Sequence, residues 1–504
     1  MKPADIKGKK EKIYKISFWI ILVIALFLRS YQYFINRSLW HDEAHLALNF
    51  VDFGFKDLSK PLEHYQSAPI FFLWGIEALS RIFGLGEMSL RIVPFVFSII
   101  AVPLFYHLVL SITKNKLTAT IAFLIYAINL SFVYYASELK PYTVDVSAYI
   151  ILIYLLVTSN AFVTRHRTLL LICSGCLLAF FSNATAVVFL CCTLYYIMQA
   201  RIINADSEKV FVMPLRNICI LGAWFIAFAL NYLLFVHDHP YAEGMRQIWS
   251  YTFCPTPFFG PEFNEYMKHY FTDLFLNDLF LVDRTYYIGY ILLLLAITGI
   301  AVALIRKQYL LLLFALLPIA IAYLFSILKL YPFYPRFILY TFPGIIIIIS
   351  NGISHLVMGF NNKGYRMVSG LMAGLFLVLL LKNSILTFPK WEIKIKPSLA
   401  YINKKFPNTT IFVTTPYTMT EYYYKTGFLK NGDIKSLTWH LDAYALLKDE
   451  NVQKQTRPFI ILHSATGGDN AEVFIKELKE RGLVLSEFRD NNFGVTEIKP
   501  ESYR

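Results

Sequence analysis

Charged side chains are scarce in this sequence. Only 16% of the 504 residues are Asp, Glu, Lys or Arg, and 57% are hydrophobic. A soluble domain carries about 25% charged residues. The shortage of charge therefore excludes an ordinary soluble protein and predicts an integral membrane protein. The aromatic fraction of 17% is typical of chains with aromatic belts at the membrane interfaces.

Cysteine is scarce as well. The chain has six cysteines, and all but Cys254 lie in apolar segments, so the sequence shows no disulfide framework. Cys173 and Cys176 have the spacing of a redox pair. We interpret them instead as small apolar residues, because they lie inside a hydrophobic run.

The formal net charge of +13 raises the question of a nucleic-acid partner. The Lys and Arg residues lie mostly in short loops between apolar runs and in the polar tail. Charges in these places set membrane topology and contact anionic lipid headgroups. We therefore expect membrane lipids as partners and no nucleic acid.

The N-terminal segment is basic and leads into an apolar run over residues 16–34. No small-residue cleavage site closes this run, so we interpret it as an uncleaved membrane span. Runs of membrane-spanning length follow, which makes about eleven predicted helices. The ten further spans are expected at 91–111, 117–135, 142–159, 168–182, 184–200, 217–236, 285–305, 308–328, 337–352 and 367–386.

The distribution of Lys and Arg predicts the orientation. With a cytoplasmic N-terminus, every short cytoplasmic loop carries Lys or Arg, as the positive-inside rule requires. The outside loops are then residues 36–90, 136–141, 237–284 and 329–336. We expect a multi-pass cell-membrane protein, with a bacterial plasma membrane favoured and the C-terminal tail extracytoplasmic.

The tail differs from the rest of the chain. From about residue 391 it becomes polar and mixed, with β-rich runs at 410–414 and 458–462 and a helical pattern over 471–481 that stops at Gly482. We therefore predict two domains: an all-α transmembrane domain over residues 1–390, with a long first extracytoplasmic loop at 36–90, and a small extracytoplasmic α/β domain over residues 391–504.

The chemistry is expected in the outside loops, above all in the loop at 36–90. An Asp-Glu pair at a membrane surface is costly to keep near hydrocarbon, and Asp42 and Glu43 follow directly on the first span. A carboxylate at this position suits glycosyl transfer, in which an acceptor hydroxyl needs a base as it attacks the anomeric carbon. The alternative is that the two acids cap a helix and compensate its dipole.

Two histidines flank the acidic pair. His41 and His45 have the i, i+4 spacing of a helical metal pair, but Asp42 after His41 breaks the His-Glu-x-x-His signature. The two histidines and two carboxylates could hold a divalent metal ion. Alternatively, they form hydrogen bonds around an acceptor site. Both interpretations stay open, and we assign no residue to a metal.

Five segments resemble glycosyltransferase family 39, which includes protein O-mannosyltransferases and lipid A aminoarabinose transferases. The resemblance covers about residues 15–360 in order. It implies the type C glycosyltransferase fold. No cofactor is assigned from the sequence, and a divalent metal ion stays an open alternative. The segments are 38–44 (SLWHDEA), 66–71 (QSAPIF), 86–94 (GEMSLRIVP), 134–142 (YYASELKPY) and 335–340 (PRFILY).

The resemblance implies a hexosyl- or pentosyltransferase that uses a polyprenyl-phosphate-linked sugar and a protein, lipid or glycan acceptor. Asp42 matches the family's proposed catalytic base and Glu43 its neighbour. Some members have a Glu directly before the Pro-containing segment. Here Ser67 and Ala68 precede Pro69, so Glu63 is the candidate replacement.

Cations at the outer ends of spans are expected to meet the donor phosphate. Lys140, Arg336 and Arg91 occupy such positions, and Arg suits phosphate because it can bind two oxygens. The alternative is that these side chains snorkel to the interface. The full set predicted to bind substrate is His41, His45, Glu63, His64, Gln66, Arg91, Glu138, Lys140, Tyr142 and Arg336.

Three other classes of membrane protein remain as alternatives to a glycosyltransferase. A lipid or glycan transporter or flippase would need polar groups or broken helices deep in the bilayer, whereas the acids here cluster in outside loops. A glycan polymerase or ligase would be an enzyme with a different donor. A membrane scaffold would use the tail as its binding module.

Overall fold

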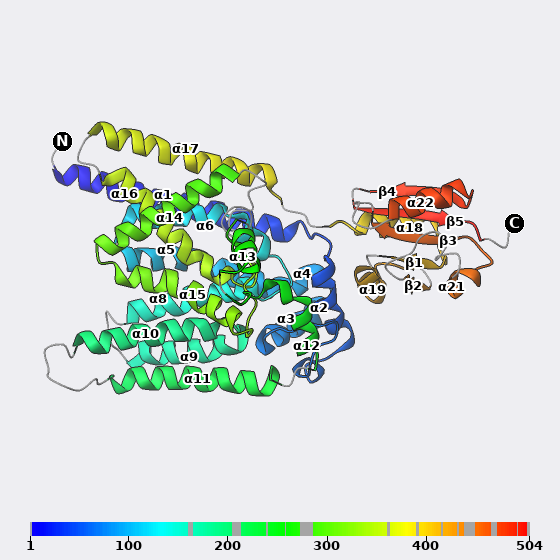
Figure 1. Ribbon diagram of the computed structural model, residues 1–504, viewed down its shortest axis with the longest axis horizontal. Coiled ribbons are helices and arrows are strands. Elements are labelled where there is room, and N and C mark those ends of the chain that lie inside the picture. The colour runs from blue at the N-terminus through cyan, green and yellow to red at the C-terminus, as the bar shows by residue number, and fades with distance from the viewer. Residues whose placement is uncertain are drawn as a thin grey trace.

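The structure is a computed structural model in which a bundle of long apolar helices carries a small mixed sheet at one end (Figure 1). The start of α1 and the strands β3, β4 and β5 lie at opposite ends of the long axis. The described residues are 3–159, 165–203, 213–237, 240–257, 259–272, 286–359, 363–389, 393–414, 417–430, 433–437, 449–464, 471–490 and 492–500.

Each of the eleven predicted spans corresponds to helix in the bundle. The span predicted at 117–135 is interrupted at Asn129, whose side chain accepts the N–H groups of Ser131 and Phe132 and caps a second short helix. The bundle helices are α1 (Pro3–Phe34), α5 (Ile92–Thr113), α6 (Lys116–Ile128), α7 (Leu130–Tyr135), α8 (Tyr142–Ser159), α9 (Arg165–Phe181), α10 (Thr185–Ile203), α11 (Leu215–Phe235), α14 (Tyr286–Ile305), α15 (Tyr309–Ile327), α16 (Phe342–Met358) and α17 (Lys363–Thr387).

Length and hydropathy mark the bundle as membrane-spanning. Within the described ranges, six helical segments are long and apolar enough to cross a bilayer, and they fall in α1, α5, α11, α15, α16 and α17. Four shorter apolar helices, in α6, α8, α10 and α14, accompany them. The chain is therefore a multi-pass membrane protein.

Small residues let the bundle helices approach closely. A Cβ on Gly299 of α14 would lie 2.0 Å from the carbonyl oxygen of Ile348 in α16. A Cβ on Gly352 of α16 would lie 2.4 Å from the carbonyl oxygen of Leu295 in α14. Because lipid tails are as apolar as the side chains, close backbone packing of this kind is a main source of helix association in a membrane.

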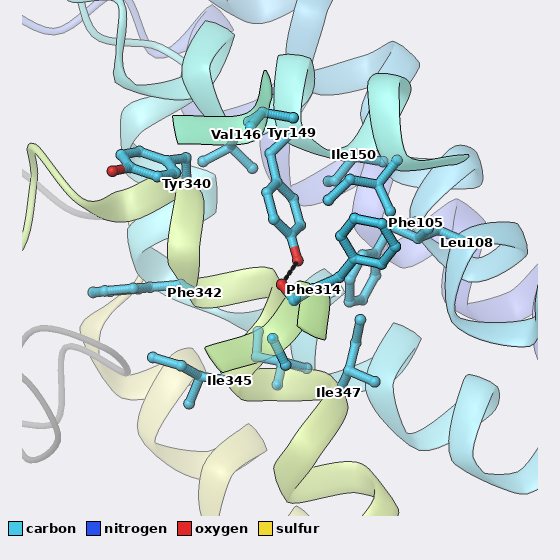
Figure 2. Close-up of a cluster of buried hydrophobic side chains, with 14 of the residues drawn as sticks. Phe105, Leu108, Val146, Tyr149, Ile150, Phe314, Tyr340, Phe342, Ile345 and Ile347 are labelled. Carbon is cyan, nitrogen blue, oxygen red and sulfur yellow. Dashed lines mark hydrogen bonds between the residues drawn. The ribbon is translucent and has the colours of Figure 1, made fainter. Parts of the chain in front are cut away.

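The centre of the bundle is a buried cluster in which aromatic rings and aliphatic side chains from α5, α8, α15 and α16 interdigitate (Figure 2). The hydroxyl of Tyr149 points toward α15 and donates to the carbonyl oxygen of Phe314 at 2.5 Å. This bond satisfies a polar group that would be costly to bury without a partner.

The predicted outside loop at 36–90 is largely helical. It contains α2 (His41–Asp52), the 3-10 turn η1 (Asp57–Ser59), α3 (Ile70–Phe83) and α4 (Glu87–Leu90). Other short elements connect the bundle helices: α12 (Ala242–Ile248), η2 (Ser250–Thr252), α13 (Pro261–Thr272) and η4 (Leu339–Thr341). In Figure 1, α2, α3, α4 and α12 lie at the end of the bundle that faces the sheet.

The C-terminal part is a five-stranded mixed sheet in the order β2-β1-β3-β5-β4. The β1 strand pairs in parallel with β2 and β3, and β5 pairs antiparallel with β3 and β4. Its elements are α18 (Lys396–Lys405), β1 (Ile411–Val413), α19 (Tyr417–Lys425), β2 (Ile434–Ser436), α21 (Glu450–Gln453), β3 (Phe459–Ser464), α22 (Ala471–Glu480), β4 (Val484–Arg489) and β5 (Phe493–Ile498).

The structure confirms the fold class that the tail's sequence predicts. The strands expected at 410–414 and 458–462 are β1 and β3, and the expected helix is α22. Gly482 follows α22 with a φ of +69°, a left-handed conformation that favours glycine at a helix end. The predicted domain boundary between residues 390 and 391 lies outside the described residues.

A second apolar core joins the segment at residues 36–90 to the C-terminal part. Leu46 and Leu48 of α2 belong to the same buried cluster as Leu399 of α18 and Tyr422 of α19. The α19 helix packs directly against α2. The helix that carries Asp42 therefore lies between the bundle and the C-terminal part.

Candidate active site

Glu43 is the centre of a buried ionic cluster at the start of α2. Its two carboxylate oxygens accept bonds from Arg37 Nη1 at 2.8 Å and from Arg91 Nε and Nη2 at 2.8 and 2.6 Å. The backbone N–H of Leu139 donates to the same carboxylate at 2.8 Å, and the N–H of Trp40, the residue before α2, donates at 3.4 Å. Glu43 thus caps its own helix and fastens it to two other segments.

The charge balance of this cluster is favourable. Burial alone would raise the pKa of Glu43, but the charges of Arg37 and Arg91 outweigh it and lower the pKa to about 2. The two guanidinium groups also donate to the backbone carbonyls of Ser137, Arg37 and Ser38. A buried charge is tolerated when it is paired and hydrogen-bonded in this way.

Asp42, one residue earlier, faces a different direction and forms an ion pair with Arg336. The distance from Asp42 Oδ2 to Arg336 Nη2 is 2.8 Å, and 23% of the Asp42 side chain is exposed. Arg336 follows α15 and precedes η4, so the pair joins the start of α2 to a segment late in the chain. Asp42 is therefore an accessible carboxylate held beside a cation.

Aromatic rings surround the Arg336 guanidinium. Its central carbon lies 4.9 Å from the ring centroid of Trp249 and 5.5 Å from that of Trp40. Tyr334 and Phe337 lie at 5.7 and 5.5 Å. Rings at these distances attract a cation through their quadrupoles. The Nε of Arg336 is buried with no hydrogen-bond partner among the described residues, so the guanidinium retains a free donor.

Glu138 is a buried carboxyl beside the pair. Its Oε1 accepts a bond from Trp40 Nε1 at 3.2 Å, and its Oε2 has no partner among the described residues. Burial, reinforced by the negative charge of Glu43, raises the pKa of Glu138 to about 7. Glu138 is therefore a carboxyl that can hold a proton near neutral pH.

Lys140 completes the charged group. Its Nζ donates to Gln66 Oε1 at 2.6 Å. Burial lowers the pKa of Lys140, although the carboxylate of Asp42 acts in the opposite direction. Tyr142 lies at the start of α8, and its ring packs edge-on against Phe337 at 5.9 Å.

Three imidazole rings form a cluster near Asp42. The rings of His41 and His45 are 4.1 Å apart, and His64 stacks parallel to His45 at 5.5 Å. His45 also contacts the hydroxyl of Thr418 from α19 at 3.0 Å. Burial and the neighbouring imidazoles of His41 and His64 lower the pKa of His45 to about 3, so its ring is neutral at physiological pH.

No group of three or more His, Cys, Asp or Glu side chains with the geometry of a metal site occurs in the part of the chain that the structure describes. Glu63, the predicted replacement for the missing acid, has an exposed side chain. Its backbone N–H bonds the Asn49 side chain.

The structure separates the predicted site residues into two groups. Glu43 and Arg91 belong to the buried cluster, where their polar atoms already have partners. The others, apart from Glu63, lie around the ion pair of Asp42 and Arg336: His41, His45, His64, Gln66, Glu138, Lys140 and Tyr142.

Sequence reasoning missed three residues: Arg37, Trp249 and Thr418. Arg37 directly precedes the Asp-Glu segment, but an arginine at the end of a span cannot be distinguished by sequence from one that snorkels. Trp249 lies in a loop with no motif. Thr418 lies 373 positions from His45, so no local pattern could connect them.

Comparison with known proteins gives the class. A family model described as dolichyl-phosphate-mannose-protein mannosyltransferase matches residues 67–235, about a third of the chain. No curated protein matches the sequence. The match confirms the resemblance to glycosyltransferase family 39: the chain is a membrane glycosyltransferase of the kind that draws its sugar from a lipid-linked donor. The segment with Asp42 lies outside the matched residues.

The architecture is similar to that of a solved structure. The crystal structure of ArnT from Cupriavidus metallidurans bound to undecaprenyl phosphate aligns over 95% of this chain and 97% of that one, with a TM-score of 0.52 and 11% identity. The Archaeoglobus fulgidus oligosaccharyltransferase in complex with zinc and sulfate aligns over 88% and 68%, with a TM-score of 0.48 and 12% identity. The ArnT alignment confirms the type C glycosyltransferase fold.

The raised pKa of Glu138 predicts a pH effect on stability. Its pKa is about 7 in the folded protein against an ordinary value of 4.5. Between these pH values the folded protein retains a proton that the unfolded chain releases. The contribution of this carboxyl to stability is therefore lost as pH rises from 4.5 through 7, by on the order of 1 kcal/mol per pH unit.

Glu138→Gln removes this titration. We expect the thermal unfolding midpoint of the variant in detergent to rise relative to that of the wild type as the pH increases from 4.5 to 7.5. Glu63→Gln, at an exposed position, serves as the control and should follow the wild type. Parallel curves for Glu138→Gln and wild type would show that folding does not raise the pKa of Glu138.

Proposed function

We propose that the protein transfers a sugar from a polyprenyl-phosphate donor to an acceptor hydroxyl on the extracytoplasmic side, with Asp42 as the general base. The observation that carries this proposal is the ion pair of Asp42 and Arg336 at the end of the bundle. It unites a partly exposed carboxylate with a cation that retains an unused donor. These are the two charges that the reaction needs.

The chemistry follows from the charges. The acceptor oxygen attacks the anomeric carbon while the bond from that carbon to the phosphate oxygen breaks. The bonding electrons leave with the polyprenyl phosphate, and the acceptor proton passes to Asp42. Arg336 stabilises the phosphate as its negative charge grows. No proton donor is required for the leaving group, because a phosphate leaves as an anion.

The ion pair also suggests an order of events. Without donor, Asp42 and Arg336 neutralise each other at 2.8 Å. A donor phosphate competes for the guanidinium, which can bind two of its oxygens. Donor binding would then release an Asp42 oxygen to accept the proton. Lys140, buried beside the pair, offers a second positive charge for the same phosphate.

We assign Glu43 and Arg91 to positioning, whereas sequence interpretation placed them in catalysis and substrate binding. Both Glu43 oxygens are engaged by Arg37 and Arg91, so they cannot accept the acceptor proton without breaking the cluster. We assign the histidines to the acceptor, since His41, His45 and His64 form one cluster of rings near Asp42.

The proposed orientation has α1 beginning in the cytoplasm and the sheet outside. The start of α1 and the sheet lie at opposite ends of the molecule, and the site lies at the end with the sheet (Figure 1). Undecaprenyl phosphate is bound in the ArnT structure. This ligand supports a polyprenyl phosphate donor here, with a protein, lipid or glycan as acceptor.

Asp42→Asn tests the base. The full-length protein in liposomes is given radiolabelled polyprenyl-phosphate sugars and a membrane glycoconjugate extract as acceptor, and loss of label from the donor is measured. Transfer should fall at least about 100-fold, because a positioned base contributes roughly 10²–10⁴-fold. Donor binding should persist, since Arg336 loses its competing partner. Near-wild-type turnover would remove Asp42 from this role.

Arg336→Lys tests the donor phosphate. Lysine keeps the charge but loses the two-pronged geometry, and one charge-assisted hydrogen bond is worth about 1.5–3 kcal/mol. Donor affinity should weaken roughly tenfold to hundredfold, and Arg336→Ala should lose more. Arg246→Lys on α12, an exposed arginine, is the matched control. An unchanged donor titration for Arg336→Lys would mean that Arg336 only anchors the chain at the interface.

A further inference from the structure

The C-terminal part bonds directly to the segment that leads into α2. The hydroxyl of Tyr423 in α19 accepts the backbone N–H of Leu39 at 3.0 Å and donates to Glu87 Oε1 at 2.8 Å. Tyr423 and Leu39 are both buried, and 384 positions separate them in the sequence. This single hydroxyl ties together the C-terminal part, the start of α4 and the chain just before α2.

Lys396, the first residue of α18, holds the same segment from a second position. Its Nζ donates to the carbonyl oxygen of Asn36 at 3.2 Å and forms an ion pair with Glu87. Its backbone N–H reaches Ser38 Oγ at 3.5 Å. The stretch from residue 36 to 39 is therefore fixed by two elements of the C-terminal part.

The body of α2 has a third set of contacts with α19. Thr418 Oγ1 lies 3.0 Å from His45 Nε2, on the face of α2 that lines the site. Lys425 forms an ion pair with Asp52 at 2.7 Å at the far end of the helix. Contacts at the start, middle and end of α2 fix its position along its whole length.

The position of α2 matters because Asp42 lies three residues after Leu39. On its inner side the helix is fastened by Glu43 to Arg37 and Arg91. On its outer side it rests on α19. A displacement of about 1 Å at a reacting group can cost on the order of 10²-fold in rate. The C-terminal contacts are thus placed to control where the Asp42 carboxylate lies.

We propose that the C-terminal α/β part is a positioning element of the transferase, in which Tyr423 and Lys396 fix the start of α2 and thereby place Asp42 for proton transfer. This inference rests on the proposed role of Asp42. Neither residue touches the ion pair of Asp42 and Arg336, so each acts through the backbone at residues 36–39. The site is then incomplete without the C-terminal part, although every group proposed to react lies in the first 336 residues.

Tyr423→Phe tests the proposal. The ring stays in the apolar core, and only the hydroxyl with its two bonds is lost. We expect kcat to fall about tenfold while the donor KM changes less than twofold, because the Arg336 surroundings are untouched. Tyr424→Phe is the matched control: that ring is 43% exposed, and its loss of hydroxyl should leave kcat unchanged.

The variant is made in two backgrounds, wild type and Asp42→Asn, and the rate of donor consumption is measured on folded, monodisperse protein. If Tyr423 acts through Asp42, Tyr423→Phe slows the wild type but not Asp42→Asn. A tenfold loss in both backgrounds, or in neither, overturns the positioning role. Near-wild-type turnover of Asp42→Asn alone overturns the proposed function and this inference with it. Should Tyr423→Phe yield no folded protein, Lys396→Met is made in the same two backgrounds. It should likewise slow the wild type but not Asp42→Asn.

Discussion

The ionic cluster of Glu43 with Arg37 and Arg91 is the interaction on which the site depends. It draws the end of α1, the start of α2, the start of α5 and the segment before α8 to one point. Each of these segments carries or supports a group around Asp42. Because all three charges are buried, no water can replace a missing partner, and the cluster holds its geometry only as a complete set. The neighbouring carboxylates Asp42 and Glu43 therefore have opposite environments. Asp42 is accessible beside the Arg336 cation, whereas both oxygens of Glu43 are occupied by hydrogen bonds.

Further contacts around the Glu43 cluster fix other segments of the site. Arg336 adds the late segment before α16, and the aromatic rings of Trp40 and Trp249 enclose its guanidinium. The helices α18 and α19 of the C-terminal part hold the segment before α2 through Lys396 and Tyr423. A transferase that works at a membrane surface must keep its reacting groups fixed while a long lipid donor enters from the bilayer. Cross-links among segments far apart in the sequence provide that rigidity without disulfides.

Much of the fold could be predicted from sequence, because apolar runs of membrane length and their flanking charges are local signals. The spans, the strands β1 and β3 and the helix α22 are of this kind. The site was only partly predictable. The sequence pointed to Asp42 and Arg336 separately, but their pairing depends on how the bundle folds. Glu43 and Arg91 are ordinary site candidates by composition, and only their mutual burial shows that they bind each other. Thr418 and Tyr423 carry no local signal at all, since their partners lie hundreds of residues away.

The most direct test of this account is the thermal unfolding midpoint of Glu43→Gln in detergent, compared with the wild type and with Glu77→Gln. Glu77 is also a buried carboxyl, but its partner is the single, exposed Arg81. Glu43→Gln leaves two buried guanidinium groups without their counter-charge, which should cost about 3–5 kcal/mol. Glu77→Gln should cost about 1 kcal/mol or less. We expect a clearly lower midpoint for Glu43→Gln than for Glu77→Gln. Equal midpoints for Glu43→Gln and wild type would contradict it, because the site would then not depend on this cluster.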